Sequence, residues 1–289
     1  MKTRVITALV GIVVLVLVML TFNTMVFNLV VAAVALIGMH EVYAALGFDR
    51  KDWLLYAVQV PYTLLVMLSS YQKPRGAVMA ASFALILFYC IYLVVRNGTV
   101  SYQKVSGLLM FSGIIVFCFY SLIHLKVLLP VEQYSYDAIF FILLILCFAW
   151  GGDTCAYFAG RAFGKHKLCP KVSPKKTVEG AVGGVLGTML FGVIITVIYS
   201  VVADRTEAFT RSNIGVSMYL IIALLGVVAA VLGIYGDLFA SVVKRQCGIK
   251  DYGTIFPGHG GILDRFDSVM FIAPFVSIAV RHFFYLLAR

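Results

Sequence analysis

VSMYLIIALLGVVAAVLGIYGDLFA, residues 216–240, is an apolar run in which Asp237 is the one charged residue. About 20 mainly apolar residues are enough for a helix to cross the hydrocarbon core of a bilayer. Apolar and polar residues do not alternate with a period of two, as they would in the strand of a membrane β-barrel. The run therefore predicts a membrane-spanning helix that carries an acid near one end.

The whole chain has the composition of a membrane protein. Of its 289 residues, 62% are hydrophobic and 12% are charged, and the mean hydropathy is +1.00. Soluble domains have about 25% charged residues, so much of this chain must contact lipid. We expect an all-α, polytopic integral membrane protein with about nine transmembrane helices. The expected spans are 5–22, 25–46, 53–70, 77–96, 105–124, 138–159, 180–202, 216–240 and 267–287.

The first span follows Lys2 and Arg4, as the apolar part of a secretory signal peptide does. Its apolar run is long, and no cleavage site with small residues follows it. We therefore interpret it as a retained span.

The net charge of +10 indicates the kind of partner. In a soluble protein this charge would suggest nucleic acid. Here the basic residues occupy short loops between apolar runs, a pattern typical of membrane orientation and of binding to anionic headgroups or phosphates. We expect the lipid bilayer, and no nucleic acid, as a partner.

Lys and Arg also predict the orientation. With the N-terminus in the cytoplasm, 16 of the 23 lie on the cytoplasmic side, as the positive-inside rule favours. Ten of these 16 lie in two loops, 160–179 and 241–266, which could carry them for chemistry. The orientation thus depends on these loops being cytoplasmic. We expect a multi-pass protein of the cell (plasma or inner) membrane, with its N-terminus and active site in the cytoplasm and its C-terminus outside.

The polar residues divide the chain into two regions. Residues 1–130 have few charges inside apolar runs, with His40 and Glu41 as the exception. Residues 131–289 contain Asp153, Asp237 and the two polar loops. Because ionisable groups inside a membrane are costly and commonly functional, we predict an N-terminal membrane scaffold and a C-terminal catalytic region.

The segment from Asp237 onwards combines acids and cations. In a helix, Asp237, Ser241, Lys244 and Arg245 share one face. One acid, one hydroxyl and two cations are the groups that a site for metal and phosphate needs. Lys and Arg after a span also have an ordinary explanation as orientation charges.

The run Pro257-Gly258-His259-Gly260-Gly261 cannot continue that helix. Its glycines can bring backbone N–H groups close to an anion. Asp264 and Asp267 follow, spaced so that both could face one ion, although Asp267 could be only a helix cap. The N-terminus of the last span would direct its positive dipole end towards a phosphate.

A second group of residues lies between 150 and 184. Gly152, Ala156, Gly160 and Gly164 recur every four residues, which predicts a face for close helix packing. The same helix carries a polar stripe, and the loop after it continues with residues that could bind phosphates. The polar stripe is Asp153, Tyr157 and Arg161, and the loop residues are Lys175, Lys176 and Thr177. Glu179 could be a cap of the next span or part of the site.

Ser241–Asp267 resembles the C-terminal signature of the CDP-diacylglycerol synthases, the phosphatidate cytidylyltransferase family, along its whole length. Residues 153–184 are similar to the family's second conserved block, through the runs GRAFGK at 160–165 and SPKKTVEG at 173–180. Length and number of spans also fit, so the resemblance covers the chain.

The resemblance implies transfer of CMP from CTP to phosphatidic acid, giving CDP-diacylglycerol and pyrophosphate, with Mg²⁺ required and a second metal ion possible. It implies that Asp237 and Asp264 hold metal, that Ser241 and Lys244 belong to the same site, and that the protein is a homodimer. The expected residues are, for catalysis, Asp237, Ser241, Lys244, Arg245, His259 and Asp264; for substrate binding, Asp153, Arg161, Lys175, Lys176, Thr177, Lys250 and Arg265; and for metal, Asp237, Asp264 and Asp267. His259 could hydrogen-bond a phosphate or act as an acid.

Two alternatives stay open. A related enzyme acting on another membrane lipid phosphate, such as an isoprenoid-ether phosphate, would share the phosphate site and differ in its lipid groove. A transporter or lipid scaffold would need a polar path across the bilayer midplane, usually built from an internal repeat. The acids and basic loops cluster on one side, which disfavours the transporter. The roles of Glu41, Asp153, Asp251 and His259 stay open as well.

Overall fold

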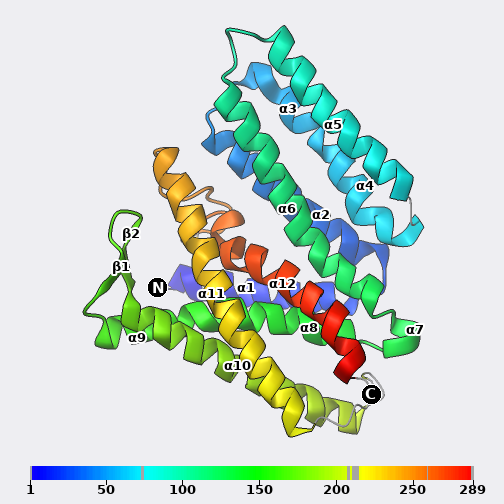
Figure 1. The fold of residues 1–289 in the computed structure, drawn as a ribbon, viewed down its shortest axis with the longest axis vertical. Helices are drawn as coiled ribbons and strands as arrows, with labels where there is room; N and C mark the ends of the chain where they lie inside the picture. The colour runs from blue at the N-terminus through cyan, green and yellow to red at the C-terminus, as the bar shows by residue number, and fades with distance from the viewer. Residues whose placement is uncertain (1, 73–74, 207–208, 210–214, 259, 288–289) are drawn as a thin grey trace. The chain divides into compact units, whose positions relative to one another are not determined.

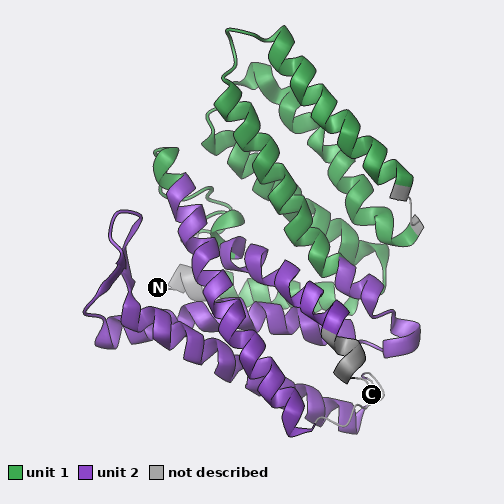
Figure 2. Ribbon diagram, viewed as in Figure 1, with its two compact units in different colours: residues 1–123, 244–265 green, residues 124–243, 266–289 purple. Residues whose placement is uncertain are grey.

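The computed structural model describes residues 2–72, 75–206, 209, 215–258 and 260–287, and these are mostly helical (Figure 1). The chain forms two compact units (Figure 2). Unit 1 is Met1–Ile123 with Lys244–Arg265, and unit 2 is His124–Val243 with Phe266–Arg289.

Unit 1 is built mainly from the N-terminal helices. They are α1 (Lys2–Leu20), α2 (Met25–Ala45), α3 (Trp53–Ala57), α4 (Gln59–Gln72), α5 (Arg75–Val95) and most of α6 (Tyr102–Leu128), with a 3₁₀ turn at Arg50–Asp52. Buried polar groups fasten these helices. Asn28 of α2 donates to Met67 O of α4 at 2.7 Å, and Asp52 accepts from Tyr92 Oη at 2.7 Å and from Arg96 at 3.3 Å. Such buried pairs satisfy polar groups that lipid could not.

Unit 2 contains most of the remaining elements. They are α7 (Val131–Tyr134), α8 (Asp137–Leu146), a π-helical turn (Cys147–Gly151), α9 (Gly152–Phe163), β1 (Lys167–Cys169), β2 (Ser173–Thr177), α10 (Val178–Arg205), α11 (Val216–Gln246) and α12 (Leu263–Leu287). The last residues of α11 and the first of α12 belong to unit 1. Strands β1 and β2 pair antiparallel, with Lys167 opposite Thr177.

The helices α9 and α10 pack through small residues. A Cβ atom on Gly180 would lie 2.9 Å from Ala156 O and 3.2 Å from Gly160 Cα. A Cβ atom on Gly184 would lie 3.1 Å from the Cβ of Ala156. The backbones approach closely because neither partner carries a bulky side chain. The predicted packing face on α9 is confirmed.

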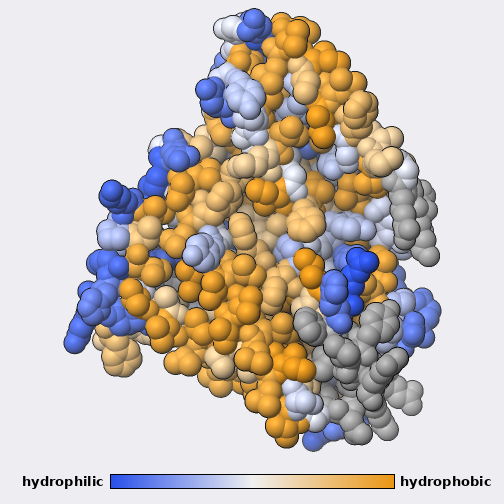
Figure 3. Space-filling model, in the orientation of Figure 1, coloured by the Kyte–Doolittle hydropathy of each residue, from blue (hydrophilic) through white to orange (hydrophobic). Residues whose placement is uncertain are grey.

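Seven helices of the described residues are long and apolar enough to cross a membrane. They cover Met25–Ala45, Arg50–Tyr71, Gly76–Val95, Tyr102–Leu128, Asp137–Phe163, Val178–Arg205 and Val216–Gln246. Many apolar side chains on them are exposed, for example Met79 at 75% and Phe83 at 67%, and apolar side chains cover much of the visible surface (Figure 3). Exposed apolar surface of this extent belongs in lipid. The all-α, polytopic membrane class is confirmed.

The first and last predicted spans, 5–22 and 267–287, fall on the helices α1 and α12. The apolar part of α1 is the shorter stretch Ile6–Leu20. The last predicted span corresponds to α12, whose first turns carry Asp264, Arg265 and Asp267. Neither α1 nor α12 is one of the seven helices found among the described residues.

The two predicted polar loops contain regular structure. The loop at 160–179 includes the hairpin β1–β2, where hydrophilic side chains gather (Figure 3). The loop at 241–266 is shorter than predicted because α11 continues to Gln246 and α12 begins at Leu263. Apolar composition marks the part of a helix that lies in lipid, and a helix can continue beyond it.

Candidate functional site

A buried ion pair in unit 1 joins the end of α11 to the start of α12. Lys244 Nζ lies 2.7 Å from Asp264 Oδ1, and the two side chains are 11% and 3% exposed. The other oxygen, Asp264 Oδ2, accepts from the backbone N–H groups of Tyr252 at 2.8 Å and Gly261 at 2.9 Å. The ammonium of Lys244 also lies 5.5 Å from the ring centre of Tyr252, within reach of a cation–π contact. The structure thus brings together two residues predicted for one site.

Glu41 of α2 binds the N-terminus of α12 within unit 1. Its Oε1 accepts from Ile262 N at 2.8 Å, and its Oε2 accepts from Leu263 N at 2.9 Å. The first N–H groups of a helix have no partner inside the helix, so this buried carboxylate satisfies two of them and complements the positive dipole end. Sequence reasoning left the role of Glu41 open; its only signal was an acid near the end of an apolar run.

The glycine-rich run bonds to the protein itself. Gly260 and Phe256 exchange backbone hydrogen bonds of 3.2 and 2.9 Å, while Gly261 donates to Asp264. The N–H groups of Gly260, Gly261, Ile262 and Leu263 thus have protein acceptors in this structure. Binding of an anion by this run stays a prediction. Gly260 has a φ of 90°, which favours glycine at this turn. The predicted role of His259 lies outside the described residues.

Asp237 of α11 is the acid of a second ion pair, in unit 2. Its Oδ2 lies 2.5 Å from Lys176 Nζ of β2, and both side chains are about a quarter exposed, at 27% and 25%. Ser241, one helical turn later, donates to Asp237 Oδ1 at 3.3 Å. Three predicted site residues from two distant segments are therefore in contact.

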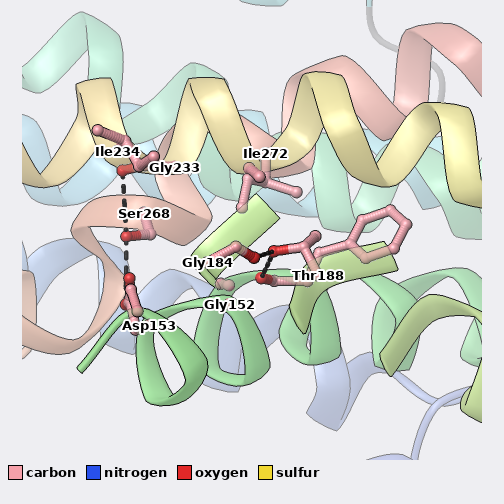
Figure 4. A pocket seen from close by; sticks show the side chains of 12 residues that line it. Gly152, Asp153, Gly184, Thr188, Gly233, Ile234, Ser268 and Ile272 are labelled. Carbon is pink, nitrogen blue, oxygen red and sulfur yellow. Dashed lines mark hydrogen bonds between the residues drawn. The ribbon is translucent and has the colours of Figure 1, made fainter. Parts of the chain in front are cut away.

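A small cavity in unit 2 lies beside Asp153 (Figure 4). Its volume of about 20 Å³ is enough for one water molecule. Ser268 Oγ lies between Asp153 Oδ2 and Gly233 O, at 3.4 and 3.3 Å. The same residue donates its backbone N–H to Asp267 Oδ1 at 2.8 Å. Sequence reasoning missed Ser268, whose only signal is a hydroxyl next to Asp267.

The hairpin β1–β2 is fastened to α10 at its base. Thr177 accepts from Gly180 N at 3.1 Å as the N-cap of α10, and it is 7% exposed. Glu179 binds His166, with 2.6 Å between Oε1 and Nδ1 and 3.2 Å from each oxygen to the backbone N–H. The predicted phosphate binder Thr177 thus has a capping role in this structure. Glu179 ties the hairpin to its helix, and its carboxylate also accepts a hydrogen bond from its own backbone N–H in the first turn of α10.

The other predicted cations are at the surface. Arg161, Lys175, Arg245, Lys250 and Arg265 are all exposed. Exposure leaves them able to reach an anionic partner.

Within the described ranges, no three His, Cys, Asp or Glu side chains lie close enough together to hold a metal ion by themselves. Asp237 in unit 2 and Asp264 in unit 1 are each paired with a lysine. A cation bound at either carboxylate would need further oxygen ligands, which phosphate groups supply readily.

The chain is similar to proteins of one family along nearly its whole length. Residues 2–283 match the cytidylyltransferase family. The chain is 30% identical over 203 residues to a phosphatidate cytidylyltransferase of Bacillus subtilis (strain 168), covering 70% of this chain and 68% of the relative. It is also 30% identical over 285 residues to the phosphatidate cytidylyltransferase of Staphylococcus aureus (strain COL), covering 96% and 98%. The protein therefore belongs to the cytidylyltransferase family, as Ser241–Asp267 predicted.

Proposed function

We propose that this protein is a CTP:phosphatidate cytidylyltransferase, a nucleotidyltransferase of phospholipid biosynthesis. It transfers CMP from CTP to phosphatidic acid and produces CDP-diacylglycerol and pyrophosphate. The observation that carries the proposal is the similarity to a phosphatidate cytidylyltransferase over 96% of the chain. The two aspartate–lysine pairs, at residues where acid and cation were predicted for a phosphate site, support it.

The reaction is a direct displacement at phosphorus. A phosphate oxygen of phosphatidic acid attacks the α-phosphorus of CTP in line, a new P–O bond forms, and the bond to the β-phosphate breaks to release pyrophosphate. Both reactants are anionic, so the enzyme must orient them and neutralise their charge. Lys176 and Lys244 are the cations held in place by acids, and the exposed Arg245, Lys250 and Arg265 add positive charge.

The aspartates fit a magnesium ion through their chemistry. Mg²⁺ prefers carboxylate oxygens together with substrate phosphates and water, and Asp237 and Asp264 each form an ion pair with a lysine. We propose Asp237, Asp264 and Asp267 as residues that bind Mg²⁺, each together with oxygens of the substrate phosphates. The bound ion would neutralise negative charge that develops on the phosphates.

We place the protein in the cell membrane with its N-terminus and the segments 160–179 and 241–266 in the cytoplasm, where CTP is found. The excess of Lys and Arg in these segments supports that orientation. The family resemblance also leads us to propose a homodimer.

The proposed activity is tested with the purified full-length protein in lipid nanodiscs. With labelled CTP, Mg²⁺ and phosphatidic acid, we expect labelled CDP-diacylglycerol and one pyrophosphate per product. Removing Mg²⁺ with EDTA should reduce the rate to background, and returning it should restore the rate. A clear preference for an isoprenoid-ether phosphate would favour the related enzyme, and no binding of CTP in the presence of Mg²⁺ would overturn the proposal.

Lys176 and Lys175 form a matched pair of neighbouring lysines. Lys176→Met removes the cation that contacts Asp237, and we expect it to lower kcat/KM by at least about tenfold, the effect of losing a charge-assisted contact. Lys175→Met removes an exposed cation and should have a smaller effect. Steady-state kinetics in nanodiscs measure both, and equal losses would contradict a special role for Lys176.

A further inference from the structure

We infer that Glu41 is a positioning residue for the transfer of CMP: it holds the loop residues 252–258 and 260–263 in the conformation that places Asp264 against Lys244. The inference rests on the proposed function and assigns a role in it to the N-terminal region, which sequence reasoning treated as scaffold. All the contacts behind it lie within unit 1.

The first observation is that both carboxylate oxygens of Glu41 accept hydrogen bonds from the backbone. Its side chain is inside the protein, with the residue 4% exposed. Each carboxylate oxygen accepts one backbone N–H from the start of α12, at 2.8 and 2.9 Å. Hydrogen bonds to an ionised acceptor are about twice as strong as neutral ones. Glu41 therefore fixes the position at which the loop ends and the helix begins.

The second observation is the fit of the loop around this carboxylate. Gly253 and Gly261 both pack against it, and a Cβ atom on either residue would collide with Glu41. Gly253 and Gly261 thus lie closer to the carboxylate of Glu41 than a residue with a Cβ atom could. Replacing either glycine would force the loop or the carboxylate of Glu41 to shift.

The third observation connects Glu41 to the predicted catalytic acid. Gly261 contacts the carboxylate of Glu41 and donates its N–H to Asp264 Oδ2 at 2.9 Å. Tyr252, next to Gly253, donates to the same oxygen at 2.8 Å. Because the residues that surround Glu41 also orient Asp264, a change at Glu41 alters the geometry of the Asp264–Lys244 pair.

Glu41 acts through the loop and does not take part in the reaction itself. Both of its oxygens bind backbone N–H groups of the enzyme. Glu41→Gln keeps the shape of the side chain but places an amide N–H₂ against one of the two N–H donors, so that one hydrogen bond is lost. Glu41→Asp keeps the charge and shortens the reach.

The experiment compares Glu41→Gln and Glu41→Asp with a control, Asp52→Asn. Asp52 is also a buried acid of unit 1, 6% exposed, and it binds Tyr92 and Arg96, which are not residues of the loop. We expect Glu41→Gln to lower kcat by about 100-fold, the effect of a small displacement of a catalytic group, with little change in the KM for CTP. Glu41→Asp should recover part of the loss. Asp52→Asn should lower the thermal midpoint at least as much as Glu41→Gln does, and it should keep kcat within about threefold of wild type.

A second readout does not depend on activity. Lys250 is an exposed residue in the segment just before this loop, so trypsin cleavage after it reports how often the segment opens. We expect faster cleavage in Glu41→Gln than in Asp52→Asn at equal thermal stability. A kcat of Glu41→Gln close to wild type, or equal cleavage and equal loss of kcat in the control, would overturn the inference. An inactive wild-type protein that still shows the difference in cleavage would instead refute the proposed function.

Discussion

Asp264→Asn is expected to abolish CMP transfer, with kcat reduced by at least about 100-fold, in a protein that is still folded in the membrane. The reason is electrostatic: the substitution removes the negative charge proposed to hold Mg²⁺, and a bound metal is worth several kcal/mol in the transition state. The asparagine oxygen can still accept the hydrogen bonds that the backbone N–H groups of Tyr252 and Gly261 donate to Asp264. Product formation and Mg²⁺ dependence in nanodiscs measure the effect.

The substitution also leaves Lys244 without its buried partner, which costs about 3–5 kcal/mol when one member of such a pair is removed. The double variant Lys244→Met with Asp264→Asn separates the two effects, because it removes both charges together. We expect it to be more stable than Asp264→Asn alone and equally inactive. Full activity of Asp264→Asn, or recovery of activity in the double variant, would show that Asp264 serves only to pair with Lys244.

Gly180→Leu is expected to destabilise unit 2 by about 3 kcal/mol or more, the upper range for overpacking of a close contact. Even the Cβ atom of the new side chain would lie 2.9 Å from Ala156 O and 3.2 Å from Gly160 Cα, so α9 and α10 would have to separate. Lys176 lies on β2, which leads into α10, so activity should fall as well. The thermal midpoint and the fraction of monodisperse protein in detergent measure the loss.

Gly113→Leu is the matched control, since it makes the same change on α6 where a Cβ atom meets nothing within 4 Å. We expect its thermal midpoint to stay close to wild type. If Gly180→Leu proves as stable as Gly113→Leu, the small residues of α9 and α10 do not form the close contact described above.

The membrane class could be predicted from the sequence because lipid imposes a simple requirement. A spanning helix must satisfy its own backbone hydrogen bonds and present an apolar surface, and composition records both. The ends of the helices are less predictable. The run at 216–240 predicted the apolar part of α11, but the helix continues through Lys244 and Arg245 to Gln246, since charged residues outside the hydrocarbon core are compatible with helix.

The hairpin β1–β2 could not be predicted from its own residues. β1 has only three residues, and β2 reads SPKKT, with a proline and two lysines that are uncommon in strands. It is held instead by contacts at its base, where Val178 N donates to His166 O at 2.9 Å and Glu179 binds His166. Contacts of this kind depend on tertiary structure and leave no local pattern.

In the candidate site, too, contacts within one helix could be predicted, and contacts between distant parts of the chain could not. Helical spacing correctly placed Ser241 beside Asp237. The sequence identified Lys244 and Asp264 as residues of the site, but it did not predict that they form an ion pair across 20 residues. Glu41 was visible only as an acid in an apolar run, because its partners are more than 200 residues away in the chain.

That distance has a consequence for how the protein is made. Glu41 and Ile262 are separated by 221 residues, which a ribosome adds in about 10–45 s at about 5–20 residues per second. Throughout this interval α2 is already synthesised, but the backbone groups that will bind its carboxylate do not yet exist. The nascent chain must tolerate an ionisable side chain in or near lipid, and unit 1 can complete its fold only when nearly the whole polypeptide has left the ribosome.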